Sequence, residues 1–361
     1  MLTKSRKLTS VVVLFSICML ASGMSQKANA RIPDDESPSS RSVQTSTLTS
    51  ALPAKFRAMT PAESVGADLV KRYRTESGFN GVFVDGPTLV RLAMKGGKVD
   101  TPQPTDGVTI VVESTTFSFE ELLVAARRLD KQNPKSYGTT IESDKGRLVM
   151  NLAPTAPLRV DGSILVDKTL VDPLIDVVAT ILLSPPKLDA AEGGRLSDGN
   201  GCTTGFRYNG SLISSASHCS NNFGYVNGVA ITWQADYCDI DNQTGTSYGN
   251  DTGTAVQGMP FWGGQGDVGY GTQVYKWGTA TLWSYPTMGY LSTSTISCDV
   301  LVYLLDGGSS VGGDSGGPIM TLVWNGTGYS YNAVGTHRGS IGASLMIVPI
   351  SRINSSGLYV G

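Results

Sequence analysis

The chain has 361 residues, which is more than one small domain needs and enough for two domains that each bury a core. Only 16% of the residues are charged and the formal net charge is −2, which excludes the basic surface that nucleic-acid binding or attachment to an anionic membrane requires. The two histidines and five cysteines include no Cys-x-x-Cys pair, so we expect no zinc site built from these residues.

Residues 1–30 have the three parts of a secretory signal peptide. Three basic residues among the first seven precede an apolar run over 11–21, and residues 28–30 have the small-x-small form of a cleavage site. The run is shorter than the roughly 20 residues that span a bilayer. We therefore expect a secreted, extracellular protein without membrane attachment. Its four remaining cysteines predict two disulfides.

The glycine content divides the rest of the chain near residue 190. Residues 31–192 contain 10 glycines in 162 positions, whereas residues 193–361 contain 32 in 169. The residues up to 59 lack apolar periodicity and predict a flexible leader over 31–59. We place an α+β region over 60–188 and an all-β domain over 189–361.

The α+β region contains the same pattern twice. Helical spacing over 61–73 is followed by a hairpin pattern around Asp85-Gly86. A capping box over 118–121 then begins a second helix, which is followed by a hairpin pattern around 144–146. We predict two copies of one α+β unit, with no polar cluster that suggests chemistry. The small, polar stretch over 188–201 that follows is a segment a protease can reach.

Beyond Cys202 the sequence has short β-type runs separated by clusters of Asn, Gly, Asp and Ser, and it has no helical run of ten residues. This pattern indicates an all-β barrel or sandwich. The expected strands are 211–214, 229–233, 272–277, 279–283, 300–305, 319–324, 331–335 and 344–350.

Two motifs in this domain predict catalysis. Gly-Asp-Ser-Gly-Gly-Pro at 313–318 places Ser315 in a turn that a substrate carbonyl can approach, and the backbone N–H groups of Gly313 and Ser315 could stabilise an oxyanion. Ser-Ala-Ser-His-Cys at 215–219 supplies His218, and a serine of ordinary pKa needs such a base to attack. We predict Ser315 as nucleophile and His218 as general base.

Together with Cys-Thr-Thr-Gly-Phe at 202–206, these motifs resemble the chymotrypsin-fold serine proteases, and among them the bacterial secreted branch of streptogrisins and α-lytic protease. Residues 271–281 resemble the segment that opens the second barrel in that branch, and the twin units resemble its pro-region. The resemblance implies two six-stranded antiparallel Greek-key barrels with the site between them. It also implies a pro-region that assists folding before removal.

The function that follows is a secreted serine endopeptidase, made as a pre-pro-enzyme, that hydrolyses polypeptides through an acyl-enzyme. We expect a monomer that needs no metal or organic cofactor and that has its own pro-region as a partner. Two departures from the family are Ser217, where Ala or Gly is usual, and the lack of a cysteine four residues before Ser315. The rival hypotheses are a catalytically silent binding protein on a protease scaffold and an esterase.

The third member of the triad must be chosen from the eight aspartates between His218 and Ser315. Asp239 follows an expected strand and precedes an isoleucine, as in the Asp-Ile or Asp-Val pairing of the family. We choose Asp239, with Asp241, Asp267 and Asp251 as alternatives in that order.

The cysteines suggest two pairs. Cys202 and Cys219 are near in sequence and form the first, which leaves Cys238 with Cys298. The second bond would fix the Asp239 strand to the second barrel.

The resemblance also predicts the residues that determine specificity. In the family, the residue six positions before the catalytic serine forms the base of the primary specificity pocket, and here that residue is Ser309. A basic substrate side chain would therefore meet no counter-charge. His337 resembles the pocket histidine of glutamyl-specific members, and Ser310 and Arg338 would add a donor and positive potential.

Glutamate is absent after Glu192, although the 169 residues that follow keep nine aspartates. At the upstream frequency of 8 in 162, about eight glutamates would occur there. We predict cleavage after glutamate, with aspartate weaker, and self-maturation at Glu192-Gly193 within a junction between about 184 and 200. The alternative is a preference for small or aromatic apolar residues.

Overall fold

The computed structural model describes residues 56–361 except for 98, 101, 103–106, 157–167, 183–186, 189–190, 193–199, 220–224, 227–228, 248–255, 257–258 and 296–299. The expected signal peptide and leader residues 31–55 lie outside this part of the chain. Residues Leu52–Gly361 form one compact unit. No helix within the described ranges is long and apolar enough to cross a membrane.

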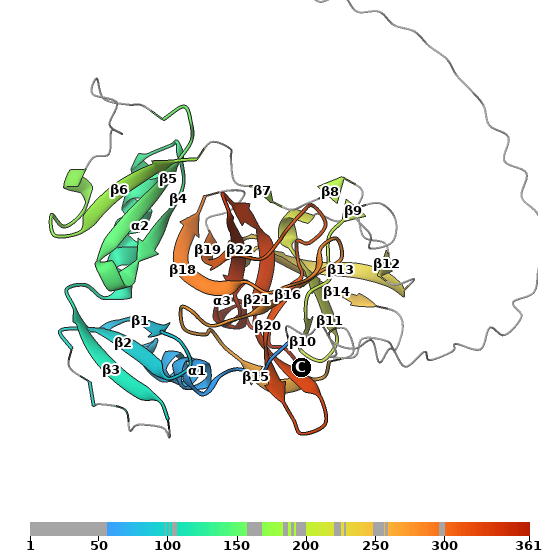
Figure 1. Cartoon of the computed structure of the whole chain (residues 1–361). Helices are drawn as coiled ribbons and strands as arrows, with labels where there is room; N and C mark the ends of the chain where they lie inside the picture. Colours follow the sequence, from blue (N-terminus) through green and yellow to red (C-terminus); the bar gives the residue numbers. More distant parts are fainter. Residues whose placement is uncertain are drawn as a thin grey trace, which may run out of the picture. The chain divides into compact units, whose positions relative to one another are not determined.

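The first α+β unit is a helix packed on a three-stranded sheet (Figure 1). Thr60 and Glu63 form a reciprocal capping box that begins the helix. The apolar face of this helix, on which Leu69 is buried, packs against the fully buried Val90 and Leu92. Strands β1 and β2 are antiparallel, whereas β2 and β3 are parallel. The bounds are α1 Pro61–Tyr73, β1 Phe79–Val84, β2 Leu89–Lys95 and β3 Thr109–Thr115.

The second unit repeats this topology. Ser118 and Glu121 cap its helix, β4 and β5 are antiparallel, and β6 is parallel to β5. The bounds are α2 Phe119–Gln132, β4 Ser136–Glu142, β5 Arg147–Leu152 and β6 Asp176–Ile181. Both helix-and-hairpin predictions are therefore confirmed. The third strand of each unit was not predicted, because its partner is reached only through a long connection that leaves no hairpin signal.

The all-β domain begins with a five-stranded antiparallel sheet in the order β10-β11-β14-β13-β12. Its central strand, β14, is almost entirely polar, yet Asn242 and Thr244 are buried within it. The bounds are β10 Arg207–Tyr208, β11 Leu212–Ser215, β12 Tyr225–Val226, β13 Val229–Tyr237 and β14 Asn242–Ser247.

A larger sheet forms the rest of the domain, in the order β17-β16-β20-β21-β22-β19-β18. Its long strand β21 pairs with both β20 and β22 and contains an irregularity between His337 and Gly339. The bounds are β15 Phe261–Gln265, β16 Tyr275–Gly278, β17 Leu282–Ser284, β18 Thr287–Ser294, β19 Val300–Asp306, β20 Pro318–Trp324, β21 Tyr329–Ile341, β22 Ser344–Pro349 and the short helix α3 Ile350–Ser355. The pairing is antiparallel except that β15 is parallel to β21.

The all-β fold class is confirmed, and each of the eight expected strands overlaps an observed one. The main core lies against β20, β21 and β22, where Met320, Tyr331 and Met346 have no exposed surface. Strands β14 and β18 were not expected, because their polar sequences carry no alternating apolar pattern.

The sheet of the second unit continues the larger sheet. Strand β4 pairs with β18 through Ile141–Leu291 and Thr140–Ser292. At the same junction, buried Asp130 accepts hydrogen bonds from the Thr293 hydroxyl and from Thr139. A separate short strand, β7 (Lys187–Leu188), pairs with β21, and β8 (Ala191–Glu192) pairs with β9 (Asn200–Gly201).

The last residues of the expected flexible leader are packed. Phe56 is 8% exposed and contacts aromatic rings of the larger sheet. The Met59 amide donates to the Leu322 carbonyl at 3.1 Å. The leader prediction is corrected for residues 56–59, because an apolar side chain and a backbone hydrogen bond fix them.

Candidate active site

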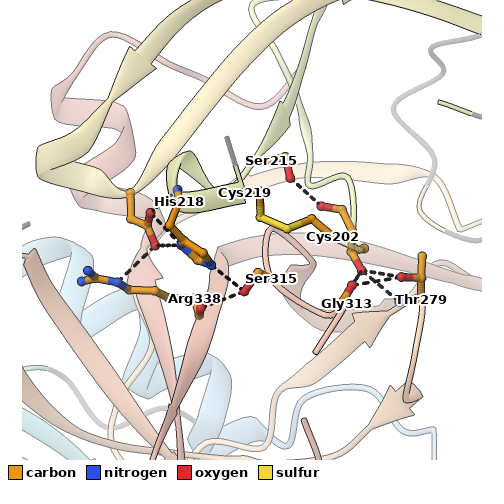
Figure 2. Close-up of a disulfide and its surroundings, with 10 residues drawn as sticks. Cys202, Ser215, His218, Cys219, Thr279, Gly313, Ser315 and Arg338 are labelled. Carbon is orange, nitrogen blue, oxygen red and sulfur yellow. Dashed lines mark hydrogen bonds and ion pairs between the residues drawn. A yellow bond between two sulfur atoms is a disulfide. The ribbon is translucent and has the colours of Figure 1, made fainter. Parts of the chain in front are cut away.

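His218 and Ser315 come together at the centre of the site. His218 lies in a 3-10 turn, Ser217–Cys219, directly after β11, and Ser315 lies in the turn before β20. The His218 Nε2 is 2.8 Å from the Ser315 Oγ (Figure 2). The two side chains, 97 residues apart, therefore have the hydrogen-bond geometry that a general base and a nucleophile require.

The other ring nitrogen of His218 faces a carboxylate. Its Nδ1 is 2.9 and 2.8 Å from the two oxygens of Asp241, and the His218 backbone N–H donates to the same group at 3.1 Å. Both side chains are at least 96% buried. An ionised Asp241 accepts the Nδ1 proton, which leaves Nε2 to accept the Ser315 proton. The arrangement can thus act as a Ser-His-Asp relay of hydrogen bonds.

Burial alone would raise the pKa of Asp241. The side-chain and backbone hydrogen bonds from His218, together with the positive charge of Arg338, outweigh burial, so the pKa of Asp241 lies below its ordinary value. The carboxylate is therefore ionised at neutral pH.

The choice of Asp239 is corrected to Asp241. The Asp239 side chain is 63% exposed and faces Arg352 at 4.0 Å. It lies in a 3-10 turn, Cys238–Ile240, which ends at Asp241 in the left-handed region at φ 43°. That reversal directs the Asp241 side chain inward. Aspartate is among the few non-glycine residues that adopt this conformation, and this tolerance was the one local signal available.

Of the two remaining alternatives, Asp267 does not contact His218. Asp267 is buried elsewhere, where it accepts from the Ser351 hydroxyl at 2.7 Å and pairs with Arg74 at 3.1 Å. Asp251 lies outside the described residues.

Arg338 was expected in the substrate pocket, but its guanidinium pairs with the Asp241 carboxylate. Its Nε is 3.1 Å from the Asp241 Oδ2, and its side chain is fully buried. Its backbone carbonyl also accepts from the Ser315 Oγ at 2.9 Å. The single Ser315 proton can go to this carbonyl or to His218, and only the second arrangement prepares attack. The prediction that Arg338 adds positive charge to the substrate pocket is therefore corrected: its guanidinium lies beside Asp241.

A buried ion pair stabilises the nucleophile turn, which is residues 313–317 around Ser315. The Lys276 Nζ is 2.7 Å from the Asp314 carboxylate, and both side chains are fully buried. The other Asp314 oxygen accepts from the backbone N–H groups of Ala280 and Thr281, at 3.1 Å each. Burial opposes ionisation, but Lys276 and these donors lower the pKa of Asp314. No sequence pattern predicted this pair, since its members are 38 residues apart.

The disulfide Cys202–Cys219 is confirmed, and it joins the segment of His218 to the segment that contacts the turn around Ser315. Cys219 follows the base, and Cys202 precedes Thr203. The Thr203 N–H donates to the Ser315 carbonyl at 2.7 Å, and its hydroxyl donates to the Gly313 carbonyl at 2.7 Å. The covalent bond therefore connects His218 to the residue that holds the nucleophile turn.

Cys238 also forms a disulfide. Cys298 lies outside the described residues, so the Cys238–Cys298 pairing remains a prediction.

Glycines permit the shape of the nucleophile turn. Gly313 and Gly316 have φ values of +106° and +87°, which L side chains rarely adopt. A Cβ at Gly316 would lie 2.2 Å from the Thr203 carbonyl, so no larger residue fits. The role of the Gly313 and Ser315 amides in an oxyanion hole remains a prediction.

Two of the expected pocket residues, His337 and Ser310, contact each other, whereas Ser309 does not. The His337 Nε2 is 2.7 Å from the Ser310 Oγ, and His337 is fully buried. The His337 backbone exchanges two hydrogen bonds of 2.8 Å with Gly316 and Gly317, so it is fixed to the nucleophile turn. Ser309 is exposed to solvent.

The described residues contain no group of three or more His, Cys, Asp or Glu side chains able to hold a metal ion.

No protein-family model and no curated protein matches the sequence. Among the solved structures, chymotrypsin of Cellulomonas bogoriensis has a TM-score of 0.38 and 19% identity, covering 48% of this chain and 97% of that one. A glutamic acid-specific serine protease that uses a histidine triad in substrate binding has a TM-score of 0.36 and 19% identity, covering 44% and 93%. Protease A of Thermobifida fusca has a TM-score of 0.33 and 20% identity, covering 47% and 98%. Because these TM-scores are below 0.5, function is inferred from the geometry of the site.

Proposed function

We propose that this chain is a serine endopeptidase with Ser315 as nucleophile, His218 as general base and Asp241 as the group that orients His218. The single observation that carries the proposal is the continuous hydrogen-bonded series from Asp241 through His218 to the Ser315 Oγ. Three side chains of these types in this order form the arrangement that activates a serine hydroxyl.

The chemistry follows from where the protons are held. The Ser315 oxygen attacks the peptide carbonyl carbon while His218 Nε2 takes the hydroxyl proton. The tetrahedral oxyanion would be held by the amides of Gly313 and Ser315. His218 then gives the proton to the leaving amine, and an acyl-Ser315 ester remains. Water, deprotonated by His218, attacks this ester, the acyl group leaves as the carboxylic acid product, and His218 returns the proton to the Ser315 Oγ.

The chain is further proposed to be secreted as a pre-pro-enzyme, with the two α+β units as the pro-region. Supporting this, Ser315 has no exposed surface, and Leu188 of β7 pairs with Gly339, the residue after Arg338. Lys187 and Leu188 thus lie along β21, the strand that also contains Arg338. Removal of this segment would open the site.

A preference for glutamate before the cut rests on two observations. The chain after Glu192 contains no glutamate, so a mature enzyme would lack its own cleavage site. His337 and Ser310 form a bonded pair next to the nucleophile turn and would offer donors to a carboxylate. Arg338 is paired with Asp241 and supplies no counter-charge in this scheme.

The test is hydrolysis of a peptide library by the processed chain, with Ser315→Ala as the matched control. Endopeptidase activity should appear only with Ser315 present, and an enzyme that hydrolyses esters but no peptides would support the esterase instead. Cleavage after Glu should predominate, and Ser310→Ala should reduce kcat/KM for Glu substrates more than for Leu substrates. Predominant cleavage after Leu, Phe or Ala would overturn the specificity.

A further inference from the structure

The segment just before α1 inserts an aromatic side chain into a group of rings on the all-β domain. The Phe56 ring is surrounded by Tyr275, Trp283, Tyr285 and Tyr329, with centroid distances of 5.3, 4.9, 5.8 and 6.3 Å. All four contacts are edge-to-face, the geometry that aromatic pairs prefer. We call these four residues the aromatic cluster.

Two hydroxyls of the aromatic cluster bind the backbone of the segment. The Tyr275 hydroxyl accepts from the Arg57 N–H at 3.0 Å and donates to the Arg57 carbonyl at 3.0 Å. The Tyr329 hydroxyl donates to the Phe56 carbonyl at 3.1 Å. These contacts recognise an extended peptide main chain, while the rings recognise its aromatic side chain. Such a division between main-chain bonds and side-chain pockets is how proteins bind extended peptides.

The end of the segment is fixed by further backbone and charge contacts. The Met59 N–H donates to the Leu322 carbonyl of β20 at 3.1 Å. The Arg57 guanidinium forms two bonds with Glu63, at 2.6 and 2.8 Å. Burial opposes ionisation of Glu63, but Arg57 and the Gln273 N–H lower the pKa of this carboxyl. The ion pair therefore connects the segment, α1 and the all-β domain.

We propose that the aromatic cluster is a peptide-binding exosite of the all-β domain and that Phe56–Met59 is its resident ligand. The cluster residues come from β16, β17, the turn after β17 and β21, and none of them belongs to the site around Ser315. The ligand class is an extended peptide with a phenylalanine. In the context of the proposed function, on which this role rests, the exosite anchors the pro-region independently of the chain near the nucleophile.

The test uses the full chain with Ser315→Ala, so that proteolysis plays no part in the result. Phe56→Ala empties the cluster, and the probe is a fluorescein-labelled synthetic peptide with the sequence of residues 55–60. By fluorescence anisotropy, the probe should bind Ser315→Ala/Phe56→Ala at least tenfold more tightly than Ser315→Ala, in which Phe56 competes in cis. The same peptide with alanine in place of phenylalanine should bind neither chain.

Matched variants keep the experiment decisive. Replacing residues 56–59 with Gly-Ser-Gly-Ser removes the main-chain ligand as well and should strengthen probe binding further. Adding Tyr329→Phe removes one hydroxyl donor and should weaken binding severalfold, whereas Trp262→Ala, a 55% exposed aromatic outside the cluster, should leave it unchanged. Equal binding to the filled and emptied chains, or binding independent of the peptide phenylalanine, would overturn the exosite. Because Ser315 is absent, a failure of the protease proposal would not alter these results.

Discussion

The two α+β units and the catalytic part of the all-β domain are organised by different kinds of contact. In the units, capping boxes begin both helices, and hairpins join neighbouring strands. In the site, buried polar groups are paired with residues 23 to 110 positions away, as for His218–Asp241 and Thr203–Gly313. Local patterns therefore specify the units, whereas the site exists only once the whole domain has folded.

The largest expected effect comes from the carboxylate beside His218. Asp241→Asn should lower kcat about 10⁴-fold, because an amide favours the wrong His218 tautomer, as in the triad of other serine proteases. In the same steady-state assay, the kcat of the matched variant Asp239→Asn should stay within about twofold of wild type. A large loss at Asp239, with Asp241→Asn nearly unaffected, would reverse the assignment.

The buried ion pair behind the nucleophile is expected to dominate stability. Lys276→Met should destabilise the chain by about 3–5 kcal/mol, because it leaves a buried Asp314 charge without its partner. Lys145→Met in the second unit removes an exposed pair with Glu142 and should cost at most about 1 kcal/mol. Urea unfolding measures both losses of stability. Equal unfolding midpoints for the two variants would show that the buried pair contributes no more to stability than the exposed pair.

Acid should act on the same pair. The folded pKa of Asp314 is lowered from 3.8, so its contribution to stability is complete above that pH and is lost as the pH falls further through the folded pKa. The free energy of unfolding, followed from pH 5 to pH 2.5, should fall more steeply for wild type than for Lys276→Met/Asp314→Leu. Parallel curves would show that Asp314 does not contribute to acid unfolding.

The smallest predicted effect concerns Arg338. Arg338→Gln removes a positive charge that helps to lower the pKa of Asp241, so the acidic limb of the kcat/KM profile should move to higher pH. Arg338→Lys should restore much of the profile. Arg352→Gln, which removes only an exposed contact with Asp239, should not move it. An unshifted limb with reduced kcat/KM would indicate packing alone.

The comparison also explains what could be predicted from the sequence. Ser315, His218 and the Cys202–Cys219 bond lie in short contiguous motifs, and both helices carry local caps. Asp239 was preferred to Asp241 because it precedes an isoleucine, as in the Asp-Ile or Asp-Val pairing of the family. Asp241 directly precedes β14, whose polar sequence gives no strand signal although the strand lies at the centre of its sheet.

Two further contacts had no local signal. Lys276 and Arg338 meet their carboxylate partners only because strands far apart in the chain pack together. The positions of these two charged groups therefore do not follow from residue spacing. Phe56 is the only aromatic residue of the expected leader over 31–59, and only the folded sheet reveals its role.

The central claim is that His218 activates Ser315 as a nucleophile. The most direct measurement is reaction of the processed chain with a fluorophosphonate, followed by mass mapping of the labelled peptide. A single adduct on Ser315, strongly reduced by His218→Gln and absent in Ser315→Ala, is the predicted result. An unreactive Ser315 in the processed chain, or labelling equally fast without His218, would contradict the account.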